Sequence, residues 1–100
     1  MLESRLRRAV LAALKAHYPA PCGQWRGYPR FTHGAGGGEP DIYGCWKGQM
    51  VQIELKSPNR HSSPRQRVVQ EMWESAGALV ITDATSTAEV INTLHTTLGE

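Results

Sequence analysis

The sequence predicts a small α/β (α+β) fold, a small mixed sheet flanked by helices, in the order α-β-β-β-α-β-α. Three observations predict it. Apolar residues recur at helical spacing over 2–17, which indicates an amphipathic helix. Two strand-like runs, at about 40–45 and 49–56, are separated by a short turn and form a hairpin. A helical segment then leads to the apolar run 78–82, which should lie parallel to 49–56 with a right-handed crossover.

The N-terminal third contains the first helix and one irregular strand. Helix 2–17 ends before a proline-containing stretch, because proline cannot continue a helix. Residues 24–33 are strand-like but contain Gly27 and Pro29, so an edge strand or an irregular extended segment is expected. The glycine-rich run 34–38 is either a flexible loop or a place where a nucleic-acid backbone approaches closely.

The hairpin carries the charged residues that attract most interest. Its second strand alternates, with Glu54 and Lys56 on a polar face and apolar residues on the other face. The turn is expected over 46–49, which would leave Trp46 exposed.

The second helix is predicted by agreeing start signals. Ser63 is a good N-cap, a proline follows it, and Gln66 completes a capping box. The helix is expected to stop at Gly77. The residues expected on its buried side are Val69, Met72, Trp73 and Ala76.

The C-terminal part holds one more strand and one more helix. The short apolar run 78–82 predicts a buried central strand. A second capping box, Ser86 with Glu89, opens a last helix with Val90, Ile91, Leu94 and Leu98 on one face.

Length and composition indicate one domain over 1–100 without membrane spans or a signal peptide. The net charge is +2, and basic residues gather in the first third and between 56 and 67. Such patches fit either a phosphate-rich partner or a merely soluble surface. Cys22 and Cys45 are too few for a zinc site; a single disulfide is open, but two reduced thiols in a cytosolic compartment are expected.

Two carboxylates meet when the hairpin folds. Asp41 opens the first strand and Glu54 lies in the second, so pairing brings them close together. Carboxylates repel, and a divalent cation such as Mg²⁺ or Mn²⁺, which prefers oxygen ligands, would give them a reason to be neighbours. Lys56 adds a cation where an attacking water or a phosphate would lie. The alternative is an ordinary solvated ion pair of Glu54 and Lys56.

Several segments together resemble a known family. Residues 38–41 (Gly-Glu-Pro-Asp), 54–56 (Glu-Leu-Lys) and 63–66 (Ser-Pro-Arg-Gln), with Gly77 before a valine-containing strand, are similar to the VRR-NUC branch of the PD-(D/E)xK nuclease superfamily. The predicted order of elements is also that of the superfamily's restriction-endonuclease-like core. The resemblance extends over 3–82 and implies one VRR-NUC nuclease domain of the stand-alone, Holliday-junction-resolvase-like kind.

The resemblance implies roles for individual residues. Asp41 and Glu54 would be the metal-binding carboxylates, and the backbone carbonyl of Leu55 a third protein ligand. Lys56 would orient or activate the attacking water. Gln66 would support the site, although its capping position alone also explains it.

Two further sets of residues are assigned less directly. Glu3 would match an acid next to the metal on the first helix, although an acid is also favoured there by the helix dipole. The basic residues expected to contact phosphates, or else to form a solvated face, are Arg60, His61, Arg65 and Arg67.

The function implied is that of a Mg²⁺- or Mn²⁺-dependent endodeoxyribonuclease that hydrolyses phosphodiester bonds. It would act on branched DNA such as four-way junctions or flaps, as a homodimer without a small-molecule cofactor. DNA repair in the cytoplasm of a bacterial or phage-infected cell is the expected setting. The alternatives are a non-catalytic nucleic-acid-binding module of the same fold and an RNA-directed nuclease.

Overall fold

The computed structural model describes residues 3–27, 41–55 and 64–99. Its three helices and four strands follow one another in the order α-β-β-β-α-β-α, so the predicted order is confirmed. Their bounds are α1 (Glu3–His17), β1 (Gly23–Gly27), β2 (Ile42–Trp46), β3 (Gln49–Leu55), α2 (Pro64–Ser75), β4 (Leu79–Ala84) and α3 (Thr87–Leu98). The expected extensions over 28–33, together with Pro40, Lys56 and Ser63, lie outside the described residues.

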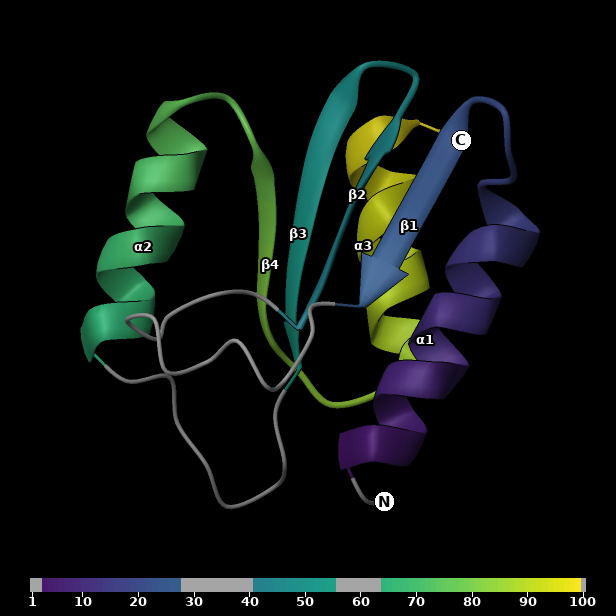
Figure 1. The fold of residues 1–100 in the computed structure, drawn as a ribbon, viewed down its shortest axis with the longest axis horizontal. Coiled ribbons are helices and arrows are strands. Elements are labelled where there is room, and N and C mark those ends of the chain that lie inside the picture. Colours follow the sequence, from purple (N-terminus) through teal and green to yellow (C-terminus); the bar gives the residue numbers. More distant parts are fainter. Residues whose placement is uncertain (1–2, 28–40, 56–63, 100) are drawn as a thin grey trace.

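The four strands form one mixed sheet in the order β1-β2-β3-β4 (Figure 1). β1 pairs with β2 and β2 with β3 in antiparallel fashion, whereas β3 and β4 are parallel, as predicted. The β2–β3 turn consists of Lys47 and Gly48, with φ of 47° and 86°. Two positive φ angles are typical of the two-residue turn that matches the twist of paired strands.

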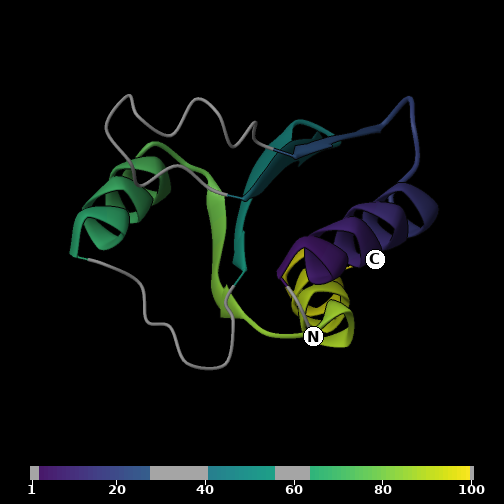
Figure 2. The same ribbon diagram turned by 60° about the horizontal axis from the view of Figure 1, so that its bottom comes forward.

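Helices cover the two faces of the sheet unequally. α1 and α3 pack against each other and cover one face, while α2 lies on the other side of β4 (Figure 2). The core lies between the sheet and the α1–α3 pair, and its buried side chains in β3 are Val51, Ile53 and Leu55. The alternation read from the sequence is therefore confirmed, with Glu54 on the opposite face.

The core also fixes the position of β1. Trp25 is 2% exposed, and its indole Nε1 donates a hydrogen bond of 2.9 Å to the carbonyl oxygen of Tyr18. Across the strands, a Cβ at Gly44 would lie 2.3 Å from the Trp25 ring, so this close approach requires glycine. The prediction that Trp46 is exposed was wrong, because the side chain is half-buried. Its ring packs edge-on against the ring of Tyr18, with the two ring centroids 5.1 Å apart. Its strand partner is Gly23, which has no side chain to displace it.

The predicted buried side of α2 was wrong for three of its four residues. No residue of α2 is buried; Met72 and Trp73 are 65% and 42% exposed, and Ala76, just after the helix, is exposed too. Of the predicted set only Val69 is half-buried, and it shares this class with Gln66 and Gln70. The reason is that α2 packs against β4, an outer strand, which offers a helix little surface to cover.

β4 differs from the expected central strand. It lies at the end of the sheet order and runs from Leu79 to Ala84, with its first two residues only half-buried. Its register with β3 shifts, since Ile53 pairs with Ile81 but Leu55 pairs with Ala84. One extra residue is therefore accommodated, and Asp83 adopts a positive φ of 57°.

The predicted cap of the last helix is confirmed. The Ser86 hydroxyl accepts a hydrogen bond of 3.1 Å from the backbone nitrogen of Glu89. The Glu89 carboxylate accepts in return from the backbone and hydroxyl of Thr85, at 3.1 Å each. Among the described residues no helix is long and apolar enough to span a membrane, and Cys22 and Cys45 are free thiols.

Candidate active site

Asp41 and Glu54 lie close together where β2 begins and β3 ends. Ile42, the first residue of β2, pairs with Ile53. The backbone nitrogen of Asp41 donates a hydrogen bond of 3.1 Å to the carbonyl oxygen of the same Ile53, so the regular register ends at Ile42 and Asp41 lies beside the last residues of β3. Glu54 belongs to these last residues, and the hairpin therefore brings the two acids to the same end of the sheet.

Each carboxylate is held by a neutral donor. Asp41 Oδ2 accepts a hydrogen bond of 2.8 Å from the backbone nitrogen of Leu55. Glu54 Oε1 accepts one of 2.8 Å from Nε2 of Gln66. Asp41, Glu54 and Gln66 are all half-buried. Fixed donors limit the rotamers of both acids and leave the face between them partly accessible.

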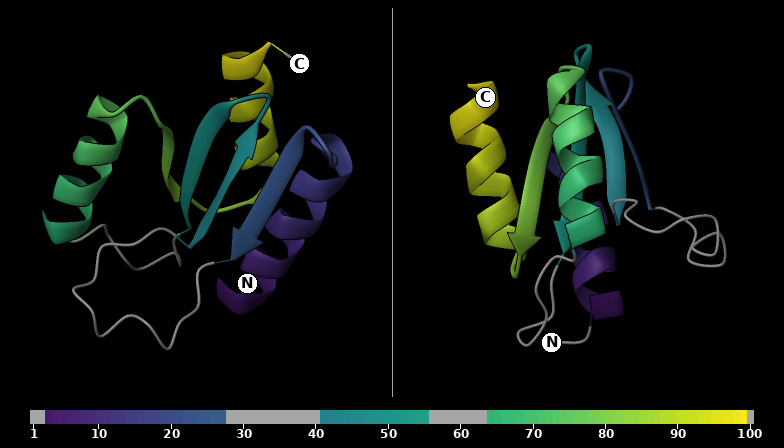
Figure 3. Two further views of the ribbon diagram at one scale, coloured as in Figure 1. Left: turned by 45° about the horizontal axis from the view of Figure 1, so that its top comes forward. Right: turned by 90° about the vertical axis from the view of Figure 1, so that its left-hand side faces the viewer.

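Gln66 connects α2 to the end of the sheet at which Asp41 and Glu54 lie. No side chain of α2 is fully buried. The hydrogen bond from Gln66 to Glu54 therefore links this helix to β3 through polar groups. The first turn of α2, the first turn of α1 and the end of β3 lie at the same end of the molecule (Figures 1 and 3). The fold therefore brings together segments that are distant in sequence.

The other predicted site residues are placed unevenly. Lys56, Arg60 and His61 lie outside the described residues, and so does the side chain of Glu3, the first residue of α1. The remaining basic residues expected to bind phosphate, Arg65 and Arg67, are exposed on α2.

The oxygen donors where β2 begins and β3 ends suit a hard cation. Within the described residues no group of three or more histidines, cysteines, aspartates and glutamates is arranged to hold a metal ion. Asp41 and Glu54 form a pair of oxygen donors, and Mg²⁺ commonly binds to one or two carboxylates while keeping several waters. The pair therefore fits Mg²⁺ or Mn²⁺ better than zinc, which prefers thiolate and imidazole ligands.

Sequence reasoning missed the row of side chains beside the carboxylates. Arg26 pairs with Tyr43, and Tyr43 pairs with Gln52, so the three side chains share the sheet face of Glu54. Gln52 is only 3% exposed although it is polar. Alternation assigned Gln52 to the polar face, but only the register shows that Arg26 belongs to the same row.

Solved structures share this fold. One, named "VRR_NUC domain", is 23% identical with a TM-score of 0.63, over 92% of this chain and 91% of that chain. Another, named "VRR_NUC domain protein", is 17% identical with a TM-score of 0.69, over 96% of this chain and 87% of that chain. No family model and no curated protein matches the sequence. The fold implied by the sequence motifs is thereby confirmed over more than nine-tenths of the chain.

Proposed function

We propose that this chain is a VRR-NUC nuclease that hydrolyses phosphodiester bonds of DNA with Mg²⁺ or Mn²⁺. The observation that carries the proposal is the pair Asp41, directly before β2, and Glu54, near the end of β3, each carboxylate held by a hydrogen-bond donor. Two carboxylates at one end of a sheet supply the oxygen ligands that a divalent cation such as Mg²⁺ prefers. The fold shared with VRR-NUC structures supports the same reading.

The proposed ligands are Asp41, Glu54 and the backbone carbonyl of Leu55, with Glu3 as a further acid from α1. When bound, the metal would neutralise charge on the scissile phosphate and favour ionisation of its water. The protein's own contribution is orientation: the Leu55 nitrogen holds Asp41, and Gln66 holds Glu54. Such supporting contacts keep ligands in position before substrate arrives.

Lys56 is proposed as the cation that steadies the phosphate and the attacking water. It directly follows Leu55, and continued alternation would place it on the face of Glu54. We assign it a positioning role and not that of a general base, because a lysine beside a polyanion retains its proton.

The proposed substrate is branched DNA, such as a four-way junction or a flap, cut by a homodimer. Two sites related by a two-fold axis would cut both strands of such a substrate. α2 supplies apolar surface for a second copy, since Val68 and Met72 are 56% and 65% exposed. Arg67 lies in its first half and Glu74 in its second, so two antiparallel copies would bring opposite charges together.

The setting of the proposed nuclease follows from the same features. One catalytic unit would occupy 1–100, without a small-molecule cofactor. The two free thiols fit the reducing cytoplasm of a bacterial or phage-infected cell, where DNA repair would be its role.

A non-catalytic nucleic-acid-binding module is the second candidate. It is favoured by the exposed basic side chains of Arg65 and Arg67 on α2, which suit contacts with a nucleic-acid backbone whether or not a bond is cut. An RNA-directed nuclease is a variant of the leading proposal, and the same assay separates it.

The test is cleavage of labelled four-way junction, flap, linear DNA and RNA with Mg²⁺, Mn²⁺ or EDTA. Asp41→Asn keeps size and removes charge at the site, whereas Asn92→Ala changes an exposed side chain on α3, which belongs neither to the site nor to the proposed dimer surface. We expect metal-dependent cutting of branched DNA, reduced roughly 100-fold or more by Asp41→Asn and unchanged in Asn92→Ala. Binding of DNA without cutting in any metal would favour the binding module.

A further inference from the structure

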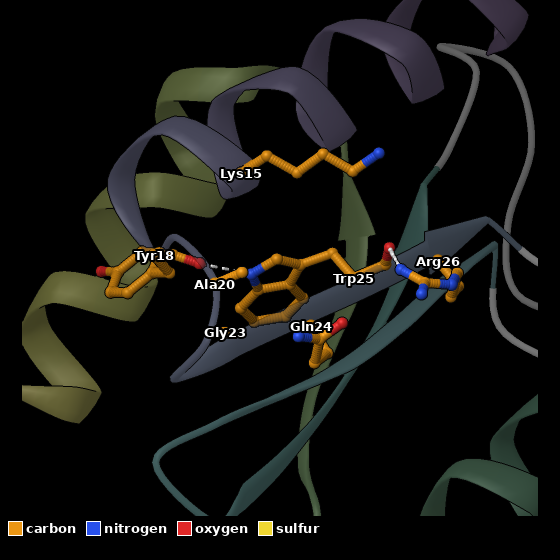
Figure 4. A pocket seen from close by; sticks show the side chains of 7 residues that line it. All are labelled: Lys15, Tyr18, Ala20, Gly23, Gln24, Trp25 and Arg26. Atoms are coloured by element: carbon orange, nitrogen blue, oxygen red, sulfur yellow. Dashed lines mark hydrogen bonds between the residues drawn. The ribbon is translucent and has the colours of Figure 1, made fainter.

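A groove runs between α1 and the outer edge of β1. It lies at the opposite side of the sheet order from β4, against which α2 packs. It opens into a cavity of about 280 Å³, with Lys15 and Tyr18 on one wall and Gly23, Gln24, Trp25 and Arg26 on the other (Figure 4). We call this feature the α1–β1 groove. No described residue that lines it is acidic.

The groove presents hydrogen-bond donors with positive charge. Lys15, Gln24 and Arg26 are exposed, and all three line the groove (Figure 4). Arg26 Nη1 donates a hydrogen bond of 2.9 Å to the carbonyl oxygen of Trp25, which holds the guanidinium over the strand edge. A guanidinium fixed at one nitrogen still offers its other donors to a planar phosphate edge.

The groove lies next to the proposed catalytic face. Arg26 is paired with Tyr43, and Asp41 is two residues before Tyr43 along the chain. From strand geometry, about 5 Å across and about 7 Å along, the Cα atoms of Arg26 and Asp41 are roughly 9 Å apart. One DNA strand carries a phosphate every 3.4 Å or so of helix axis, so this corresponds to about two to three nucleotides.

α1 extends the positive charge along the groove. The Arg7 guanidinium lies against Gly27, where a Cβ would be 2.5 Å from Nη2. Arg7 and Lys15 are eight residues apart on one helix face, hence about 12 Å along the axis. Gly27 is at the catalytic end of β1 and Gly23 at the other end, so basic residues follow the whole edge of the strand.

We infer that the α1–β1 groove binds the phosphodiester backbone of DNA beside the scissile phosphate, with Arg26 and Lys15 as the phosphate contacts. The inference rests on the proposed function. It places the path by which the bound DNA strand continues away from the site along this groove. The Trp25 ring is buried and its nitrogen already donates to Tyr18, so it offers no face to a base. The groove therefore recognises backbone charge and not base sequence.

The experiment measures binding of fluorescein-labelled duplex and four-way junction DNA in EDTA, by anisotropy, over a range of salt concentrations. Variants are Lys15→Gln, Arg26→Gln and the double variant. Lys47→Asn is the matched control, because Lys47 is an exposed cation at the far hairpin and asparagine tolerates its positive φ. We expect the slope of log K against log salt to fall by about 0.9 for each groove cation removed. The matching loss of affinity is about fivefold to tenfold at low salt.

A further variant separates charge from structure. Arg26→Lys keeps the charge but not the guanidinium bond to Trp25, so it is expected to retain most of the salt dependence. Groove variants that bind like Lys47→Asn, while Asp41→Asn still abolishes cutting, would overturn the groove and leave the nuclease proposal standing. A wild-type chain that neither binds nor cuts DNA or RNA would overturn both. Weaker binding to RNA alone, with DNA unaffected, would overturn the assignment of DNA to the groove.

Discussion

Replacing Gln66 by alanine removes the donor that holds the Glu54 carboxylate. The hydrogen bond measures 2.8 Å and has an ionised acceptor, a class worth about 1.5–3 kcal/mol when buried. Both partners are half-buried, so water replaces much of the lost interaction. We expect Gln66→Ala to lower the free energy of unfolding by about 1 kcal/mol, a fall in Tm of roughly 4–8 °C for a chain of this size.

The effect on activity is expected to be larger than the effect on stability. Without Gln66 the Glu54 carboxylate samples other rotamers, and loss of a contact that orients a metal ligand commonly costs 10- to 100-fold. Single-turnover cleavage of branched DNA at saturating enzyme measures this loss directly. A lower affinity for Mn²⁺, measured by calorimetry without DNA, is the second expected change.

Gln70→Ala is the matched control for this experiment. Gln70 is one turn further along the same helix, is also half-buried, and has the same side chain. Gln70→Ala should change Tm slightly and leave the cleavage rate within about twofold of wild type. Equal cleavage rates in the two variants would refute the reasoning that Gln66 positions Glu54, whatever their effects on Tm.

Three other changes have clear expected outcomes. Gly44→Ala should lower stability by about 2 kcal/mol in a urea titration, since the added Cβ would lie 2.2 Å from the Gln24 carbonyl oxygen; a midpoint like wild type would contradict this. Ser86→Ala removes the acceptor for Glu89 and should cost about 1 kcal/mol in the same titration, with no change in cleavage. Met72→Lys should leave the fold intact, because the side chain is 65% exposed, and shift sedimentation toward monomer; an unchanged dimer would exclude this face of α2 from the interface.

Part of the site was predictable because its signals are local. Alternation in 49–55 placed Glu54 opposite the buried face, and the short turn at Lys47 and Gly48 set the hairpin that brings Asp41 to Glu54. The resemblance to VRR-NUC domains implied that Gln66 supports the site, but its contact with Glu54 came from the structure, since helix periodicity says nothing about which strand a helix end approaches. The role of Lys56 stays a prediction.

Order along the chain, strand alternation, the Ser86 cap and the positive-φ turn were determined by the sequence itself, because each depends on residues a few positions apart. Tertiary structure alone decided that Met72 and Trp73 stay exposed and that β4 is an outer strand. It also decided that Arg26 joins the sheet face on which Tyr43 and Gln52 lie. The type of a side chain determines whether it prefers the interior or solvent. Which residue it contacts there depends on which elements pack together, and that packing is decided by contacts between distant parts of the chain.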